Sequence, residues 1–408
     1  MVRNYTIFTE FKIVFCDDYR SMNLNYPVVK IKDKSSKAFR ISKNPWVYSG
    51  AIHEMDSSLQ DAQLVSIEDS KGRIGIGYLD KNGRIPLRFL LFTEADVRFD
   101  TNSILARLKD AWNLRLSLLN FSITNSFRFI NSEGDYLPGL TVDIYHELAI
   151  FSLSSNYVKN WVHIVQEFLA TKGIKYFAIK NENSGFSFLN EKHLSEIRFK
   201  ENGLEFLFSI QDSQKTGFYL DQRENRRKIE TYASERSILN TFSFTGAFGI
   251  YGKRAKAKNI HNIDSSQKAI EVSKIIQEIN YPKDTSFQHS VADVFSFLRE
   301  MEVSKYDLIV LDPPAFAKSK KSLPQASRAY KDLNRIAIQK IARNSIIFTF
   351  SCSGFMDKNL FRQIIFAASQ EAGRKVQVLE ELGHGFDHPV DIFHPEGDYL
   401  KGLVLKIE

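Results

Sequence analysis

The spacing of hydrophobic and polar residues divides the chain into three regions after a short first segment. Between residues 28 and 92 the apolar segments are short and β-rich, as at 63–67. Glycines at 72, 75 and 77 supply expected turns, and Asn82-Gly83 is typical of a hairpin. The pattern predicts a small β-barrel within residues 28–100. Residues 1–27 do not share this pattern, so we expect them to be an N-terminal extension.

The second region mixes helical and strand periods. Apolar residues recur at helical spacing over 101–121, and a second helix is predicted over 157–171. A period-2 apolar face at Leu204, Phe206, Phe208 and Ile210 predicts the return strand of a hairpin that turns at 202–203. These elements indicate a central α+β domain, residues 101–210. Its other strands are expected at 126–130, 140–144, 148–153, 174–179 and 197–200.

From residue 211 to the end, expected strands and helices alternate. This order is typical of an α/β fold with a parallel, doubly wound, Rossmann-like sheet. The strands are expected at 237–242, 259–263, 286–289, 306–311, 345–350, 375–380 and 400–407. The main helices are expected at 267–279, 294–301, 325–342 and 358–372.

The ends of the first three of these strands suggest a ligand. The first strand leads into a turn of small residues over 242–249, where a ligand can approach the backbone closely. Asp264 ends the next strand, at the offset of a ribose-binding carboxylate. The dinucleotide glycine pattern is only partly present, which suits a cofactor without pyrophosphate, such as S-adenosylmethionine. A tight turn with a surface aspartate is the alternative. Asp293 could contact an adenine amino group or simply cap a helix.

Two further strand ends carry the candidate chemistry. Asp312 is followed by Pro313 and Pro314, which hold the aspartate in an extended conformation at the carboxyl edge of the sheet. Cys352 follows the fifth strand. A lone cysteine beside an apolar strand is usually an inert core residue. However, the fourth and fifth strands of such a sheet are usually neighbours, so we expect Cys352 and Asp312 at the same edge.

This pair suits methylation of a pyrimidine at C5. That carbon is a weak nucleophile until a thiolate adds at C6 and makes C5 enamine-like, which is covalent catalysis. A carboxyl group at the polar edge of the ring would stabilise the charge that develops on the base. A further group must later remove the C5 proton.

Composition and charge narrow the classes of protein. The 408 residues are 43% hydrophobic and 25% charged, the mix of a globular protein with two or three domains. No apolar run approaches the ~20 residues of a membrane span, and no secretory leader pattern begins the sequence. The two cysteines, Cys16 and Cys352, are too few for a disulfide framework. We therefore expect a cytoplasmic protein without a metal site or a membrane partner.

The distribution of charge favours nucleic acid as a partner. The formal net charge is +7, and the stretch after Asp312 carries lysines and an arginine without an acidic residue. A basic loop beside a proposed catalytic residue suits phosphate binding, although basic runs are more often only solvated. Two further basic clusters lie at 223–228 and 253–258. The segment 214–223, just before the α/β domain, combines a glycine, aromatic and polar residues as in a loop that covers a ligand.

Several segments together resemble a known family. They are similar to the bacterial large-subunit (23S) ribosomal RNA 5-methylcytosine methyltransferases that carry an N-terminal PUA domain. The similarity extends from about residue 28 to the end of the chain. It is carried by the segments at 44–50, 133–140, 215–223, 312–314, 330–332, 351–353 and 387–389.

The resemblance implies a PUA barrel, a central domain and a class I methyltransferase domain that uses S-adenosylmethionine. Cys352 then matches the nucleophile, and Asp312 the carboxylate that contacts both base and cofactor. Other cofactor contacts are implied at Thr216, Tyr219, Gln222, Phe244, Gly246, Asp264 and Asp293. Candidate RNA contacts are Trp46, Arg223, Lys318, Lys320, Lys321, Lys331 and His388, of which Lys331 and His388 are also candidate proton-abstracting bases.

The hypothesis is therefore methylation of C5 of a cytosine in large-subunit ribosomal RNA through a cysteine adduct. Uridine C5 methylation is the alternative within the same chemistry. Methylation of an amino group would make Cys352 dispensable, and a non-catalytic RNA-binding or ribosome-assembly factor would tolerate its loss. A dinucleotide-dependent enzyme is disfavoured by the incomplete glycine pattern. A homodimer is left open.

Overall fold

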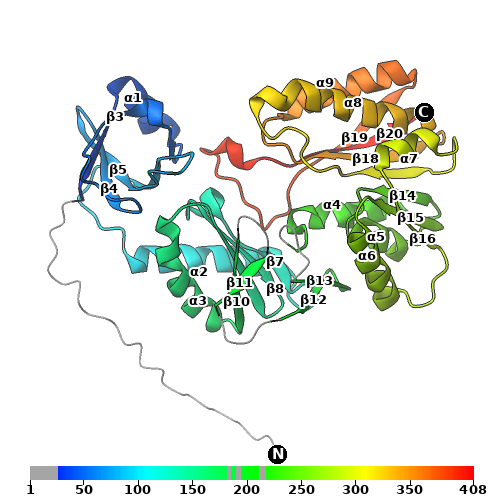
Figure 1. Cartoon of the computed structure of the whole chain (residues 1–408), viewed down its shortest axis with the longest axis horizontal. Helices are drawn as coiled ribbons and strands as arrows, with labels where there is room; N and C mark the ends of the chain where they lie inside the picture. Colours follow the sequence, from blue (N-terminus) through cyan, green and yellow to red (C-terminus); the bar gives the residue numbers. More distant parts are fainter. Residues whose placement is uncertain (1–25, 182–184, 190–193, 211–216) are drawn as a thin grey trace, which may run out of the picture.

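The computed structural model describes residues 26–181, 185–189, 194–210 and 217–408. Figure 1 shows an N-terminal barrel, a central α+β unit and a C-terminal α/β unit arranged around a segment of chain that reaches from the C-terminal sheet toward the barrel. The fold class predicted from the sequence is confirmed. Among the described helices, none combines the length and the apolar character needed to cross a membrane.

The N-terminal unit is a six-stranded sheet in the order β2-β6-β5-β4-β1-β3. The hairpin predicted around Gly83 is present, because β5 and β6 pair antiparallel on either side of it. Gly75 and Gly77 were predicted in turns but lie inside β5, where a Cβ would come within 2.2 Å and 2.3 Å of the backbone of β6. The elements are β1 (Val28–Ile31), α1 (Asp33–Ser42), β2 (Trp46–Val47), β3 (Ile52–Met55), β4 (Leu64–Asp69), β5 (Gly72–Leu79) and β6 (Leu87–Phe92).

The helix α1 is an element that the strand-rich pattern of this region did not predict. At the start of the barrel, the Pro27 carbonyl accepts a hydrogen bond from the Ser66 amide (2.9 Å), and the Tyr26 hydroxyl accepts one from Phe99 (3.0 Å). Residues 26 and 27 therefore already contact this unit.

The central unit is close to the prediction. The helix α2 (Thr101–Leu118) begins with a capping box formed by Asp100 and Ser103. A five-stranded sheet follows the order β11-β10-β9-β8-β7. The remaining elements are β7 (Ser126–Asn131), β8 (Leu140–Tyr145), β9 (Leu148–Leu153), α3 (Val162–Ala170), β10 (Tyr176–Lys180), β11 (Phe186–Phe188) and the hairpin β12 (Glu196–Glu201) with β13 (Leu204–Ser209).

The C-terminal unit is a seven-stranded sheet in the order β16-β15-β14-β17-β18-β20-β19. The first five strands of this order are parallel, as predicted, but β20 runs antiparallel to both of its neighbours. Its strands are β14 (Ser237–Thr241), β15 (Asn259–Asp264), β16 (Phe287–Val291), β17 (Leu308–Leu311), β18 (Ser345–Ser351), β19 (Val376–Leu382) and β20 (Lys401–Ile407). Its helices are α4 (Arg223–Lys228), α5 (Ala247–Arg254), α6 (Gln267–Asn280), α7 (Val294–Glu300), α8 (Leu323–Lys340) and α9 (Lys358–Ala372).

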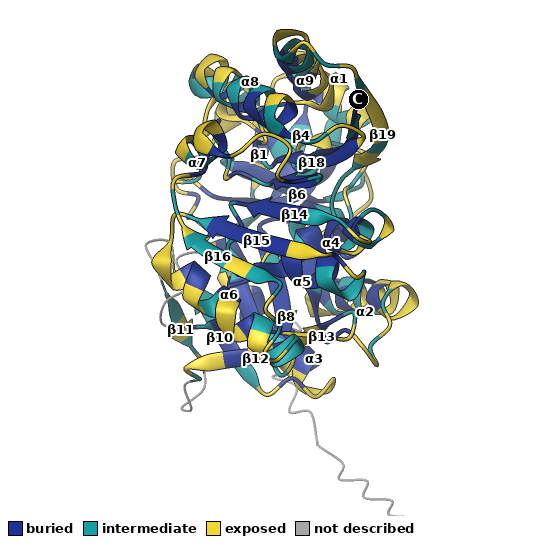
Figure 2. Ribbon diagram, turned by 90° about the vertical axis from the view of Figure 1, so that its right-hand side faces the viewer, coloured by how far each residue is buried: buried dark blue, intermediate teal, exposed yellow. Residues whose placement is uncertain are grey.

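Two apolar cores hold this sheet between its helices. One core joins the sheet to α7, α8 and α9. The other joins the opposite face to α5 and α6, and it also includes Phe199, Phe206 and Phe208 of the β12–β13 hairpin. Figure 2 shows inner strands of this sheet, such as β14 and β18, as buried, with exposed positions on the outer faces of the helices. The central and C-terminal units therefore share one core through that hairpin.

The segment of residues 383–400, between β19 and β20, links all three units (Figure 1). We call it the crossing segment. The Pro389 carbonyl accepts a hydrogen bond from Asn131 of β7 (2.9 Å), and the ring of His394 lies 4.3 Å from that of Trp46 in the barrel. This segment and the buried hairpin fix the C-terminal sheet relative to the other units.

Candidate active site

Cys352 and Asp312 lie together at the carboxyl edge of the C-terminal sheet. β17 and β18 are adjacent parallel strands, and each residue directly follows its strand. The Cys352 thiol lies 3.8 Å from the carbonyl oxygen of Pro313, the residue after Asp312. The neighbouring strand ends predicted from the sequence are therefore present.

Asp312 lies in an environment that favours its neutral form. Burial, followed by the negative charge of Asp221, raises the pKa of Asp312 to about 7. Gln222 opposes this shift by donating a hydrogen bond from Nε2 to Asp312 Oδ1 at 3.0 Å. A carboxyl group with this pKa can donate or accept a proton near neutral pH.

The turn after β14 has an unusual backbone. Phe242, Phe244 and Gly246 adopt φ angles of 50°, 47° and 75°, and bulky residues rarely occupy this left-handed region. At Gly246 a Cβ would lie 2.1 Å from Ser273 Oγ, so only glycine fits. Such strain is found most often at functional sites.

This turn also fits the cofactor that the sequence suggests. The side-chain oxygens of Ser243 and Thr245 are buried without a hydrogen-bond partner among the described residues. Buried polar groups normally have partners, so these two suit a bound ligand. Asp264 supports the turn by accepting a hydrogen bond from the Phe244 amide at 2.8 Å. The small residues, the two unpartnered hydroxyls and the nearby carboxylate together fit S-adenosylmethionine.

The remaining predicted cofactor residues, Tyr219, Asp293 and Thr216, lie in different segments of the chain. Tyr219 is 41% exposed and its ring meets that of Phe244 edge-on, with centroids 5.4 Å apart. Burial, then the charges of Asp312 and Cys352, raises the pKa of Tyr219 to about 12. Asp293 caps α7 by accepting from the Ser296 amide at 2.9 Å, which is the simpler of its two predicted roles. Thr216 lies outside the described residues.

Arg223 and His388 were predicted to contact RNA, but the structure buries both side chains. Arg223 is fully buried and pairs with Asp387 through two hydrogen bonds of 2.7 Å and 3.0 Å. His388 is 3% exposed and shares Asp387 through its Nδ1 at 3.0 Å. Neither side chain can reach a phosphate from this position, and the burial of His388 also argues against its role as the proton-abstracting base.

The basic cluster at 223–228 is therefore not a surface patch as a whole. Arg226 is also buried and forms hydrogen bonds of 2.6 Å and 2.7 Å with Glu201 of β12. In the cluster at 253–258, Lys253 pairs with Asp284 and Arg254 with Glu230. The Arg226–Glu201 pair joins the C-terminal and central units, and the other two pairs lie within the C-terminal unit, none of which the sequence pattern of charges revealed.

Two other candidate RNA contacts are occupied by protein partners. The indole Nε1 of Trp46 donates to Glu133 at 2.8 Å, and its ring packs on His394. Lys331 of α8 pairs with Glu371 of α9 at 2.6 Å. Trp46 thus serves a contact between units. Lys318, Lys320 and Lys321 are exposed after the Asp-Pro-Pro turn, as the sequence suggested.

The structure adds residues that sequence reasoning missed. Asp221 lies near Asp312 and accepts a hydrogen bond of 2.6 Å from the Tyr399 hydroxyl. Asn225 donates to Gln222 Oε1 at 2.6 Å and so fixes the amide that holds Asp312. Lys401 is buried beside the strand that carries Cys352. The lysine at the start of an otherwise largely apolar strand was the signal for the last of these.

Comparisons with known proteins agree with this arrangement. Residues 170–347 match the family of S-adenosylmethionine-dependent methyltransferases, and residues 29–92 match the PUA-like domain. A Streptococcus mutans protein assigned as a SAM-dependent methyltransferase has the same fold, with a TM-score of 0.80 at 21% identity over 93% of this chain and all of that one. A second solved methyltransferase, complexed with SAH, gives a TM-score of 0.79 at 22% identity, over 94% of this chain and all of the other.

Relatives with assigned names extend over nearly the whole chain. The ribosomal RNA large subunit methyltransferase I of Aeromonas salmonicida is 35% identical over 395 residues, which are 93% of this chain and 98% of that protein. The protein of the same name from Tolumonas auensis is 35% identical over 391 residues, 92% and 98% of the two chains. On this similarity, the chain belongs to the family of ribosomal RNA large subunit methyltransferase I, which combines a PUA-like domain with an S-adenosylmethionine-dependent methyltransferase domain.

Proposed function

We propose that this protein methylates C5 of a cytosine in large-subunit (23S) ribosomal RNA, with Cys352 as the nucleophile and Asp312 as the group that holds the base. The observation that carries the proposal is the position of the Cys352 thiol, which lies 3.8 Å from the carbonyl oxygen of Pro313, the residue after Asp312. A nucleophile and an acid side by side at a sheet edge suit covalent activation of a pyrimidine. Methylation of an amino group would need only the aspartate.

The reaction follows from what each side chain can do. The Cys352 thiolate forms a bond to C6, and the ring electrons move toward C5 while the charge on N3 is stabilised by the Asp312 carboxyl. S-adenosylmethionine, when bound, supplies the methyl group. Loss of the C5 proton to a base then restores the double bond and expels the thiolate. A pKa near 7 allows Asp312 to donate a hydrogen bond to the base at neutral pH.

The cofactor contacts are proposed at the turn after β14 and around it. At Phe244 and Gly246 the backbone would approach the cofactor closely. Tyr219 would cover the cofactor from the segment before the α/β domain, together with Thr216, three residues earlier in the sequence. Asp264 would receive the ribose and Asp293 the adenine amino group. Gln222 would act mainly through Asp312, because its amide is already engaged by that carboxyl group and by Asn225.

RNA as the substrate is supported by the names of the relatives and by the exposed lysines after Asp312. Lys318, Lys320 and Lys321 extend into solvent next to the proposed base site, where phosphates of the target strand would lie. We also propose the division into residues 1–27, 28–100, 101–210 and 211–408, because each of the three main sheets falls within one of the last three ranges. A ribosomal RNA substrate implies a cytoplasmic protein.

The test is covalent trapping with ribosomal RNA that contains 5-fluorocytosine. Fluorine at C5 cannot leave as a proton does, so the adduct with Cys352 would accumulate and be seen as a protein–RNA band resistant to denaturant. We expect trapping by the wild type and by Cys16→Ala, which removes the other cysteine of the chain. Equal trapping by Cys352→Ala would contradict the proposal. Trapping only with 5-fluorouracil RNA would move the reaction to uridine.

A further inference from the structure

The loop that carries Cys352 is held from one side by three contacts on the next residue, Ser353. The Ser353 hydroxyl accepts a hydrogen bond from the Ala317 amide at 3.2 Å and lies 3.2 Å from the Tyr330 hydroxyl. The Ser353 carbonyl accepts one from Lys401 Nζ at 2.7 Å. Ala317 belongs to the turn that follows Asp312, so this cluster ties the two parts of the proposed active site together.

Lys401 is an unusual member of this cluster. It is paired with Ser351 across the β18–β20 ladder and is only 2% exposed. A buried lysine is costly unless its charge has a use or a partner. The ammonium of Lys401 donates to the neutral carbonyl of Ser353. The neighbouring cations have carboxylate partners instead: Lys358 pairs with Asp398 at 2.6 Å, and Arg362 pairs with Glu381.

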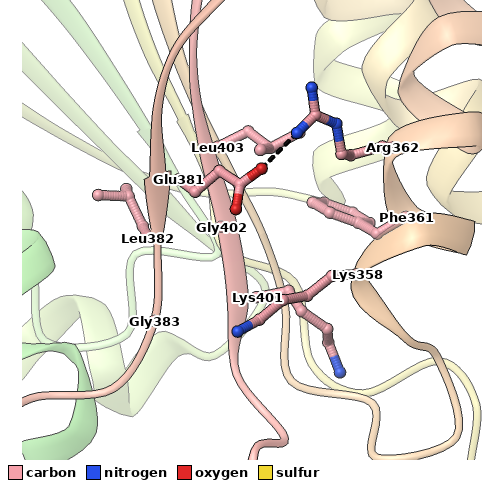
Figure 3. A pocket seen from close by; sticks show the side chains of 9 residues that line it. All are labelled: Lys358, Phe361, Arg362, Glu381, Leu382, Gly383, Lys401, Gly402 and Leu403. Carbon is pink, nitrogen blue, oxygen red and sulfur yellow. Dashed lines mark hydrogen bonds and ion pairs between the residues drawn. The ribbon is translucent and has the colours of Figure 1, made fainter.

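Lys401 lines a pocket of about 190 Å³ between α9 and the β19–β20 pair. Figure 3 shows the amines of Lys401 and Lys358 at the same end of this pocket, with the Arg362–Glu381 pair at the other. Burial lowers the pKa of Lys401 to about 8, and the negative charges of Asp398 and Cys352 oppose that effect. Lys401 and Cys352 are therefore close enough to influence each other's charge.

We propose that Lys401 is a positioning residue for the methyl-transfer reaction, which holds the Ser353 carbonyl and places a positive charge beside Cys352 that stabilises its thiolate. This inference rests on the proposed role of Cys352 as the nucleophile. A nearby cation is a recognised way to make a cysteine reactive. The charged and titratable groups that interact with Lys401 or Cys352 are Asp357, Lys358, Asp398, Tyr219 and Tyr330.

The experiment measures alkylation of Cys352 by iodoacetamide as a function of pH, in a Cys16→Ser background that leaves one thiol. In Lys401→Met the midpoint should rise by about one pH unit, so the rate at pH 7 should fall about tenfold. Lys401→Arg keeps the charge and should restore most of the rate. Lys358→Met removes the other cation at the same end of the pocket and should leave the profile unchanged.

Two further readouts separate positioning from misfolding and from the proposed function. Lys401→Met should bind S-adenosylmethionine as the wild type does in calorimetry, while its turnover number for RNA methylation falls at least tenfold. An alkylation profile in Lys401→Met that matches the wild type, or equal losses in Lys401→Arg, would overturn the inference. Methylation of RNA by Cys352→Ala would instead overturn the proposed function. The alkylation profile is measured without RNA methylation, so the two failures are distinguishable.

Discussion

The side-chain amide of Gln222 donates a hydrogen bond from Nε2 to Oδ1 of Asp312 over 3.0 Å. Gln222 is buried and its own oxygen accepts from Asn225 at 2.6 Å, so the amide cannot reverse its orientation without losing a partner. The bond favours the charged form of a carboxyl that burial drives toward the neutral form. Burial and Asp221 thus raise the pKa of Asp312, and the hydrogen bond from Gln222 limits that rise.

Replacement of Asp312 by asparagine should stabilise the protein while it removes activity. The pKa of Asp312 is about 7 in the folded protein against 3.8 in the unfolded chain. Since the folded value is higher, this carboxyl group reduces stability as the pH rises from about 4 to about 7, by on the order of 4 kcal/mol in full. Urea unfolding should show Asp312→Asn gaining a few kcal/mol more at pH 8 than at pH 5.

The control for this comparison is Asp110→Asn, an exposed aspartate of α2. It should give the same difference from wild type at both pH values. If Asp312→Asn behaves like Asp110→Asn, then Asp312 does not titrate near neutrality in the folded protein.

Asp387 should be the most costly single residue to remove from the crossing segment. It is fully buried and receives Arg223 at 2.7 Å and the Arg128 amide at 2.8 Å, while its carbonyl accepts from Arg115 at 2.7 Å. Asp387→Ala would leave the buried guanidinium of Arg223 with Glu224, at 3.1 Å, as its remaining ion partner, at a cost of about 3–5 kcal/mol in the free energy of unfolding. Urea denaturation of the wild type and of Asp387→Ala measures this difference in the free energy of unfolding.

A double-mutant cycle separates the pair from its surroundings. Arg223→Met combined with Asp387→Ala should cost less than the sum of the two single changes, because neither charge is then left alone. Burial raises the pKa of Asp387, but the charges of His388 and Arg223 outweigh that effect and hold this pKa below its usual value. The Asp387 carboxylate therefore contributes stability above about pH 4. That contribution is lost only as the pH falls through the pKa of Asp387 in the folded protein. Strictly additive costs would contradict the buried pair.

Gly246→Ala should impair binding of S-adenosylmethionine more than it impairs folding. The new Cβ would lie 2.1 Å from Ser273 Oγ and 2.9 Å from Asn262 Nδ2, at a φ of +75°. The turn must shift to relieve this, and we expect at least tenfold weaker binding of the cofactor in calorimetry. Gly373→Ala is the matched control, since its φ is +66° but no atom lies within 4 Å of the new Cβ. It should bind normally.

The exposed lysines after Asp312 should contribute to RNA affinity through their charge alone. With Lys318, Lys320 and Lys321 all changed to alanine, the slope of log affinity against log salt should become about 2 units less steep, because fewer counterions are released. Binding of S-adenosylmethionine should not change. The control is a triple alanine variant of the exposed lysines 159, 172 and 175. If its salt dependence of RNA affinity becomes less steep by the same amount, then the net charge of the protein, and not this loop, is responsible.

The sequence predicted well those features that depend on local pattern. The strand ends at Asp312 and Cys352 are neighbours as expected, since strand order in an α/β sheet follows from few rules. The direction of β20 was missed because an apolar strand has the same pattern in a parallel and an antiparallel ladder.

Long-range ion pairs explain why the sequence did not show that some of these basic residues are buried. Arg223 and Asp387 are 164 positions apart, and Arg226 and Glu201 are 25 apart. A cluster of basic residues has the same sequence pattern whether its partners are phosphates or buried carboxylates. Only the fold brings Asp387 to Arg223, and so only the structure distinguishes a link between units from an RNA-binding surface.

The role of Cys352 in C5 methylation is tested most directly by mass-spectrometric nucleoside analysis of large-subunit ribosomal RNA after incubation with labelled S-adenosylmethionine. Wild type, Cys352→Ala and Cys16→Ala would be compared on RNA from cells that lack the protein. We predict labelled 5-methylcytidine with wild type and Cys16→Ala, and none with Cys352→Ala. Label on an amino nitrogen, or full activity in Cys352→Ala, would contradict the cysteine mechanism.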